Sequence, residues 1–249
     1  MNLIVISELF PPEETSTAYI MGEITKTLSD KYNVTIVCGP EVYDQNKLTV
    51  LPKSSLIAGV TTIRVKGIKE NKANKLSRIR KFLLMSWRLY KASKKVINKG
   101  DKVLLVSNPF PLLILMAFHR KKMDYEISFL AHDLFPEPLL MRFKLPNLVY
   151  RQCLNIFNRS YARMDKIISL GRDMTDVLRE KTMPYNPNLE IIQIENWGDI
   201  NSIYPMDTHS DSDKITIEYA GNMGKSQKLD ALIEIFSKAN NKDLYLDFW

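Results

Sequence analysis

The residues best suited to chemistry in this 249-residue chain are polar groups that directly follow short apolar runs. His132 and Asp133 follow the run at 126–131, in the stretch AHDLFPEPL. Histidine gains and loses a proton near neutral pH, so it is a common partner for a reacting group. A structural explanation also fits, with His132 bonded to a neighbouring carbonyl and Asp133 capping a turn. The pattern alone leaves both explanations open.

Two further stretches suit the binding of an anion. In GRDMTD, residues 171–176, Gly171 and the following amides begin a helix whose N-terminus attracts negative charge, and Arg172 could pair with a phosphate. In GNMGKSQK, residues 221–228, two glycines and two lysines precede a helix, with Lys225 and Lys228 about one turn apart. A helix start or surface turn with solvated cations explains each stretch equally well.

Positive charge is concentrated in one segment. The chain has 35 basic and 28 acidic residues, a net charge of +7, yet residues 71–100 contain ten Lys or Arg and no Asp or Glu. This segment predicts a helix over 75–99 that packs an apolar stripe in the core, lies on an anionic membrane, or binds nucleic acid. The first two are favoured and are compatible. The stripe is Ile79, Leu83, Trp87, Tyr90 and Ile97, and the membrane-facing candidates are Arg80, Lys81, Arg88 and Lys91.

The elements that must position these residues alternate in type. Apolar runs at 3–9, 33–38, 102–107, 126–131, 165–170 and 189–194 predict buried strands, and the segments between most of them have helical periodicity. Ser16 or Thr17 is expected to cap the first helix. Such alternation indicates a doubly wound parallel α/β sheet, in which ligands bind beyond the carboxyl ends of the strands. We expect one domain over 1–197, a linker over 198–214, and a second β–α–β alternation over 215–249, too short for its own core.

Sequence motifs of several enzyme classes are absent, which disfavours a nicotinamide dehydrogenase among others. The chain has no G-x-G-x-x-G, Walker A, H-E-x-x-H or G-x-S-x-G motif, and the turn after the first strand contains no glycine. Cys38 and Cys153 show neither disulfide nor metal-binding spacing, which favours a reducing compartment. The N-terminus does not have the pattern of a signal peptide, and no apolar stretch approaches the roughly 20 residues that span a bilayer. We expect a cytoplasmic location.

Four stretches together resemble the family-4 group of retaining GT-B glycosyltransferases, above all the bacterial enzymes of capsule, O-antigen and exopolysaccharide assembly. ELFPPEETSTAYIMGEITKTLSDKYNVTIVCGP resembles the family's first strand, Pro-Pro loop and helix. AHDLFPEPL resembles its Asp-Leu-Trp-Pro-Glu stretch, with Phe135 for Trp. EIIQIENWGDIN resembles the end of its N-terminal domain, and YAGNMGKSQKLDALIEIF the Gly-Asn-x-Gly turn that begins its C-terminal domain.

The resemblance implies two Rossmann-like domains, of which the first receives an acceptor and the second a nucleotide-sugar, and transfer with retention without a metal or cofactor. His132 would be the catalytic residue that contacts the donor sugar and phosphate. Asn222 stands where many members have Arg, so Lys225 would replace that cation. The donor diphosphate would be bound by Gly221, Asn222, Lys225 and Lys228, and Glu13, Ser16, Thr17, Asp133 and Arg172 would line the cleft or the acceptor site. The loop at 12–17 departs from the family because it lacks the glycines common there.

The resemblance also leads to an expectation about completeness. The family's Glu-x7-Glu stretch would lie beyond Trp249, so we expect a truncated donor domain and little activity from this chain alone. The leading hypothesis is the N-terminal part of a hexosyltransferase-type enzyme that acts on a lipid-linked saccharide at the inner face of the cell membrane. The alternatives are a non-catalytic membrane-surface subunit that pairs with a separate donor-domain chain, and another GT-B enzyme such as a sugar-nucleotide epimerase. Nucleic acid is not an expected partner.

Overall fold

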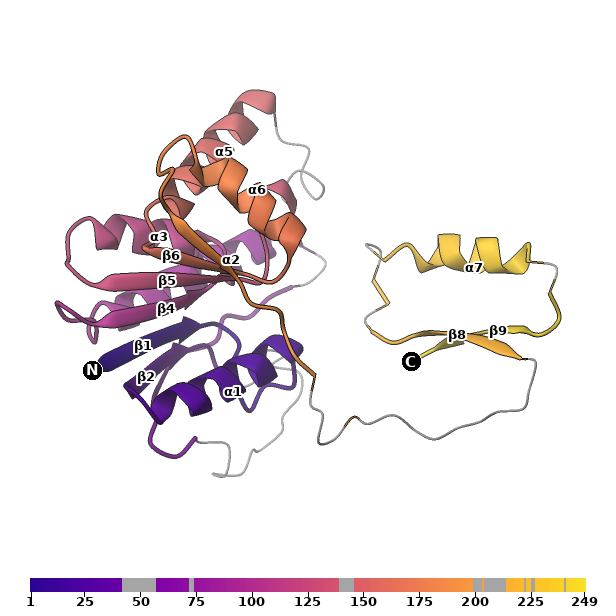
Figure 1. The fold of residues 1–249 in the computed structure, drawn as a ribbon, viewed down its shortest axis with the longest axis horizontal. Coiled ribbons are helices and arrows are strands. Elements are labelled where there is room, and N and C mark those ends of the chain that lie inside the picture. Colours follow the sequence, from indigo (N-terminus) through magenta and orange to yellow (C-terminus); the bar gives the residue numbers. More distant parts are fainter. Residues whose placement is uncertain are drawn as a thin grey trace. The chain divides into compact units, whose positions relative to one another are not determined.

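The computed structural model describes residues 1–41, 57–71, 74–138, 146–198, 203, 214–221, 223–224, 227–239 and 241–249. The chain divides into two compact units, residues 1–197 and residues 198–249 (Figure 1). Each unit is described by itself below.

The first unit is built on a parallel sheet of seven strands in the order β3-β2-β1-β4-β5-β6-β7. The chain runs outward from β1 to β3 on one side and from β4 to β7 on the other, so the direction of winding reverses between β1 and β4. The central strands are buried because both of their faces are apolar. The strands are β1 (Asn2–Ser7), β2 (Asn33–Cys38), β3 (Thr61–Arg64), β4 (Lys102–Val106), β5 (Glu126–Ala131), β6 (Lys166–Ser169) and β7 (Glu190–Gln193).

The helices cover the two faces of this sheet unequally (Figure 1). One face packs into a large core with α2 (Lys75–Ser93), α3 (Pro111–Arg120), α5 (Asn147–Tyr161) and α6 (Arg172–Thr182). On the opposite face, α1 (Ser16–Ser29) packs through Met21, Ile24 and Leu28 against a smaller core. The doubly wound parallel α/β fold is therefore confirmed.

The start of α1 differs from the prediction. Thr15, rather than Ser16 or Thr17, is the N-cap: its backbone is extended and its side chain accepts a hydrogen bond from the Ala18 N–H at 3.2 Å. The three hydroxyl residues in a row give equivalent capping signals in the sequence, so the sequence alone could not choose among them.

The second unit consists of β8 (Ile215–Tyr219), α7 (Leu229–Ser237) and β9 (Leu244–Phe248), and the two strands pair in parallel. This is the single β–α–β unit of a second Rossmann-like domain that the sequence predicts. None of its described side chains is buried. The unit therefore contributes no core of its own in the part of the chain that the structure describes.

Candidate functional site

The carboxyl edge of the sheet brings together the loops in which the sequence places functional residues. Because β1, β4, β5 and β6 are parallel neighbours, the loops that follow them leave from the same edge. The loop after β1 contains Glu13, that after β5 contains His132 and Asp133, and that after β6 leads to Arg172. The edge next to the reversal between β1 and β4 is where this class of sheet binds ligands.

The backbone of His132 is held by Ser107, the residue that directly follows β4. Ser107 Oγ accepts hydrogen bonds from the backbone N–H groups of His132 at 3.2 Å and Asp133 at 3.1 Å. Burial lowers the pKa of His132, and the Asp133 carboxylate opposes that effect. The ring Nε2 is buried and has no hydrogen-bond partner among the described residues. A neutral imidazole with a free ring nitrogen can donate to or accept from a ligand.

Glu8 is a second unpartnered group at this edge, and the sequence reasoning missed it. Glu8 directly follows β1 and is only 3% exposed. Neither of its carboxylate oxygens has a hydrogen-bond partner among the described residues. Burial raises the pKa of Glu8 to about 7; Lys81 lowers the pKa and Glu70 raises it. The Glu8 N–H donates to the Asn108 carbonyl at 3.4 Å, which places Glu8 at the reversal between β1 and β4. An acidic residue at the end of an apolar run was the available signal.

Arg64 fixes the loop that follows β1. Its guanidinium donates to the carbonyls of Pro11 and, at 3.4 Å, Gly39. The predicted cleft residues of this loop differ in exposure: Glu13 and Thr17 are half-buried, and Ser16 is exposed. Arg64 therefore positions a loop in which the sequence offers no glycine.

Arg172 is exposed and is the first residue of α6, whose N-cap, Gly171, has extended backbone. The first turn of this helix is tied to the sheet by Thr175, whose hydroxyl lies 2.6 Å from that of Ser169 and 2.9 Å from the Gly171 carbonyl. The amides and the guanidinium are thus presented at the carboxyl edge, as an anion-binding role requires. That role stays a prediction.

The predicted diphosphate residues lie in the second unit. Gly221 is exposed with φ +149°, a conformation that favours glycine. Lys228 is exposed, has left-handed backbone (φ 51°) and is the N-cap of α7. Asn222 and Lys225 lie outside the described residues. The diphosphate site stays a prediction.

One membrane-facing candidate on α2 is wrong. Lys81 is 5% exposed, and its ammonium lies 3.1 Å from the Glu70 carboxylate, so it points into the protein. Arg88 is half-buried and donates to the carbonyls of Lys66 at 2.7 Å and Gly67 at 2.9 Å. Arg80 and Lys91 are exposed, as expected.

Only part of the apolar stripe predicted for α2 faces the core, where Tyr90 packs. The helix buries Met85 and Leu89, whereas Leu83 and Trp87 are 55% and 48% exposed. The predicted helix over 75–99 ends at Ser93. Ile97 is buried, but it lies in the segment that follows the helix. The helix therefore presents both apolar and basic side chains to its surroundings.

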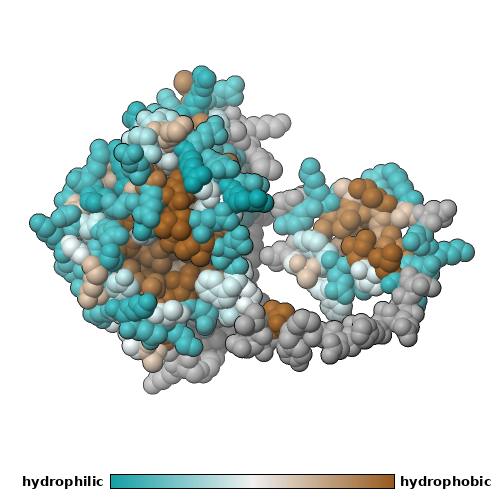
Figure 2. All heavy atoms as spheres, viewed as in Figure 1, coloured by the Kyte–Doolittle hydropathy of each residue, from teal (hydrophilic) through white to brown (hydrophobic). Residues whose placement is uncertain are grey.

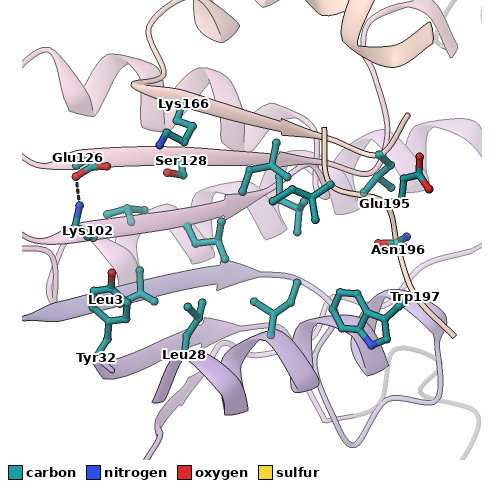
Figure 3. Close-up of a pocket in the computed structure, with 17 residues that line it drawn as sticks. Leu3, Leu28, Tyr32, Lys102, Glu126, Ser128, Lys166, Glu195, Asn196 and Trp197 are labelled. Carbon is teal, nitrogen blue, oxygen red and sulfur yellow. Dashed lines mark hydrogen bonds and ion pairs between the residues drawn. The ribbon is translucent and has the colours of Figure 1, made fainter. Parts of the chain in front are cut away.

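An apolar pocket of about 410 Å³ lies on the other face of the sheet, where α1 leaves β4, β5 and β6 uncovered (Figure 3). Leu104, Leu130 and Ile168 form its floor, and Leu28 and Trp197 stand at its side. Figure 2 shows apolar residues gathered at this face of the first unit. None of the predicted site residues lines this pocket, so it is distinct from the carboxyl edge.

No described helix meets the length and apolarity that crossing a membrane requires. Within the described ranges, His, Cys, Asp and Glu side chains do not gather in groups of three or more that could hold a metal.

This arrangement, a Rossmann-like domain followed by the first unit of another, is that of the GT-B fold. Over 99% of its length the chain superposes on 64% of the N-terminal domain of Candida albicans trehalose-6-phosphate phosphatase, with TM-score 0.65 and 13% identity. It also superposes in full on 69% of Arabidopsis thaliana UGT89C1, which was solved with UDP-L-rhamnose (TM-score 0.56, 10% identity). At these identities the likeness shows the fold alone.

In sequence, 97% of the chain is similar to 60% of a Pseudomonas aeruginosa protein named "Probable glycosyltransferase WbjE", with 23% identity over 255 residues. The chain thus spans about three-fifths of the length of that relative. No known family profile matches the chain.

Proposed function

We propose that this chain is the acceptor-side part of a glycosyltransferase that uses a nucleotide-sugar donor. The observation that carries this proposal is the carboxyl edge of the sheet, where His132 offers a neutral imidazole with a buried, unpartnered ring nitrogen. The GT-B fold and the similarity of 97% of the chain to a named glycosyltransferase support the same function. UDP-sugars are bound by two of the solved proteins that share the fold.

In this proposal His132 acts by hydrogen bonding rather than as a charged acid. Burial lowers the pKa of His132 and so favours its neutral ring, which can hydrogen-bond a sugar hydroxyl or a phosphate oxygen. The developing negative charge is on the leaving diphosphate, which cationic groups and helix N-termini stabilise. Lys228, which is exposed, is proposed for that role, together with Asn222 and Lys225, which lie outside the described residues. The reaction proceeds with retention and needs no metal.

The acceptor is proposed to be a lipid-linked saccharide in cell-surface polysaccharide synthesis, met at the inner face of the cell membrane. Support comes from α2, whose outward side combines exposed Arg80 and Lys91 with exposed Leu83 and Trp87. A helix with this composition binds anionic bilayers through both charge and apolar area. In this arrangement α2 would bring the carboxyl edge close to an acceptor that cannot leave the membrane.

Transfer is proposed to need more donor-domain residues than these 249. The second unit is one β–α–β unit without a buried side chain in its described part, and the chain spans 60% of its relative. The remaining residues would belong to a longer form of the chain or to a separate protein. The latter case corresponds to a membrane-surface subunit of a two-chain enzyme.

The test is transfer of radiolabelled sugar from UDP-glucose, UDP-galactose, GDP-mannose and dTDP-rhamnose to a membrane extract. It uses the chain alone and the chain joined to the last two-fifths of the relative. Retention is read from the anomeric configuration of the product by NMR. We expect transfer only with the added donor domain, and a loss of at least 100-fold in His132→Ala. His119→Ala is the control, because His119 lies on α3 beside Tyr125, away from the carboxyl edge. Transfer that is unchanged in His132→Ala would refute the assignment.

A further inference from the structure

A cationic groove lies between the edge strand β3 and the second half of α2. Its volume is about 760 Å³, and it is separate from the carboxyl-edge site and from the apolar pocket on the other face. Among the described residues, no Asp or Glu lines it. The lining cations are Lys66, Arg88, Lys91, Lys94 and Lys95, and the other lining residues are Ile63, Val65, Trp87, Tyr90, Ala92 and Val96.

The cations of this groove differ in their contacts. Arg88 is fixed by its hydrogen bonds to the carbonyls of Lys66 and Gly67. Lys91, Lys94 and Lys95 are exposed, and the ion pairs in the described part of the chain do not include them. Three ammonium groups are thus displayed without a described carboxylate to neutralise them. This set matches an anionic ligand in charge.

Aromatic rings form the floor under these cations. The centroids of the Trp87 and Tyr90 rings are 5.6 Å apart. The Lys91 Nζ lies 5.7 Å from the centroid of Trp87, and the Lys94 Nζ lies 5.6 Å from that of Tyr90. A half-exposed Trp beside lysines has the mixed character that suits the boundary between water and lipid.

Exposed apolar residues on the outer ridge of α2 favour a bilayer surface, rather than a soluble anion, as the ligand of this groove. Leu76, Leu83 and Trp87 are 75%, 55% and 48% exposed and are spaced by seven and four residues, so they lie on one stripe of the helix. A soluble phosphate or an anionic saccharide would pair with the lysines but would leave Leu76 and Leu83 in water. A bilayer surface satisfies both, because its headgroups pair with cations and its acyl boundary takes apolar side chains.

We propose that this groove binds the headgroup phosphates of anionic phospholipids, with the outer ridge of α2 resting in the bilayer interface. The inference rests on the membrane location in the proposed function and deepens it by naming the contact. It moves the main charge contact away from Lys81, which is buried, to Lys91, Lys94 and Lys95.

Lysines near an anionic bilayer are worth about 1 kcal/mol each, which corresponds to about fivefold in binding. Loss of three is therefore expected to weaken binding by about 100-fold. The experiment is sedimentation of the full 249-residue chain with vesicles of phosphatidylglycerol in phosphatidylcholine, and with phosphatidylcholine alone. The test variant is K91Q/K94Q/K95Q. The matched control is K26Q/K31Q/K122Q, which removes the same charge from exposed positions on other elements.

A second measurement locates the contact. Bromine on the acyl chains of the lipid quenches tryptophan fluorescence at short range, and we expect the quenched component to disappear in Trp87→Phe. Trp197 and Trp249 remain as internal references. Glycerol 1-phosphate is added as a soluble competitor, and no displacement is expected at concentrations that match the lipid phosphate.

Each outcome decides the proposal. A loss of about 100-fold in the groove variant, with the control within about threefold of the parent, supports it. Equal losses in both variants would overturn the groove while leaving peripheral membrane binding in place. Displacement by glycerol 1-phosphate would mean a soluble phosphate site instead of a bilayer site. If the parent chain does not bind vesicles, both the lipid-binding role of the groove and the membrane location are wrong. The glycosyltransferase proposal is tested separately, by the transfer assay.

Discussion

The hydroxyl of Ser107, which directly follows β4, accepts a hydrogen bond at 3.2 Å from the backbone N–H of His132, which directly follows β5. The same hydroxyl accepts the N–H of Asp133 at 3.1 Å. One buried side chain therefore sets the backbone at which the candidate catalytic residue leaves the sheet. These hydrogen bonds come from the backbone of His132 and Asp133, so Ser107 is a positioning residue.

Ser107→Ala is expected to lower the free energy of unfolding by about 1–3 kcal/mol, because two part-buried N–H groups lose their acceptor. Urea denaturation followed by circular dichroism measures this. The control is Ser29→Ala, whose hydroxyl donates to the Lys26 carbonyl in an exposed hydrogen bond and should change stability by less than about 0.5 kcal/mol. Equal stability of Ser107→Ala and the parent would show that water replaces the hydroxyl.

Asp133→Asn is expected to lower the pKa of His132 further. Burial already lowers that pKa, and the Asp133 carboxylate is the group that opposes the shift. Titration of the histidine ring protons by NMR measures the change. His119 serves as an internal control, because its pKa is lowered by burial and by Lys94 and Lys122. A His132 pKa that is unmoved or raised in Asp133→Asn would contradict the electrostatic account.

Glu8→Gln is expected to stabilise the protein at alkaline pH and to have little effect near pH 4. The folded-state pKa of Glu8 is raised from 4.5 to about 7, so the unfolded chain loses this proton first as the pH rises. Stability from this group is full below about pH 4.5 and is lost as the pH rises to about 7. The gain in Glu8→Gln at pH 8 should reach about 3 kcal/mol at most. Urea denaturation from pH 4 to pH 8 tests this, and a gain independent of pH would contradict it.

Lys81→Met is expected to destabilise the fold by about 1–3 kcal/mol, since the half-buried Glu70 carboxylate loses one of its two cationic partners and keeps Arg78. The change should also raise the pKa of Glu8, because Lys81 lowers it. Thermal denaturation at pH 7 reports the first effect, and the pH dependence of stability reports the second. Arg80→Met, on the exposed side of the same helix, should cost less than about 0.5 kcal/mol. If Arg80→Met proved as costly as Lys81→Met, the loss would reflect the helix rather than the buried pair.

The sheet could be predicted from the sequence because its strands are buried on both faces. Continuous apolar runs such as those of β1 and β4 need no knowledge of their neighbours to be recognised. Their order, with its reversal between β1 and β4, comes from the structure, because the handedness of the crossovers does not fix it. His132 and Asp133 were found for the same reason, since a parallel sheet exposes its ligand edge directly after each apolar run.

The side-chain environment of α2 could not be predicted in the same way. Its apolar and basic residues are interleaved all round the helix, so periodicity alone did not show that Met85 and Leu89, rather than Leu83 and Trp87, face the core. The burial of Lys81 depends on Glu70, a residue outside the helix whose position only the fold reveals. Glu8 and Arg64 were missed because their partners, Asn108 and Pro11, come from other loops.

Gly39, directly after β2, is a position where the fold tolerates no side chain. Its N–H donates to the Glu8 carbonyl at 3.0 Å, and a Cβ on Gly39 would lie 2.4 Å from that same oxygen. Since the obstacle is backbone, no rotamer change relieves it. The backbone after β2 would have to move away from the loop after β1, and the hydrogen bond would be lost.

Gly39→Ala is therefore expected to lower the free energy of unfolding by about 2 kcal/mol or more, through overpacking and the lost hydrogen bond. It should also weaken nucleotide-sugar binding by the donor-completed protein, because Arg64 joins the Gly39 carbonyl to Pro11 in the candidate cleft loop. Urea denaturation and isothermal titration with UDP-glucose measure the two effects. The matched control is Gly198→Ala, where a Cβ meets nothing within 4 Å and the change should be below about 0.5 kcal/mol. A Gly39→Ala protein as stable as the Gly198→Ala protein would show that the two loops separate at little cost, and that their contact does not set the shape of the carboxyl edge.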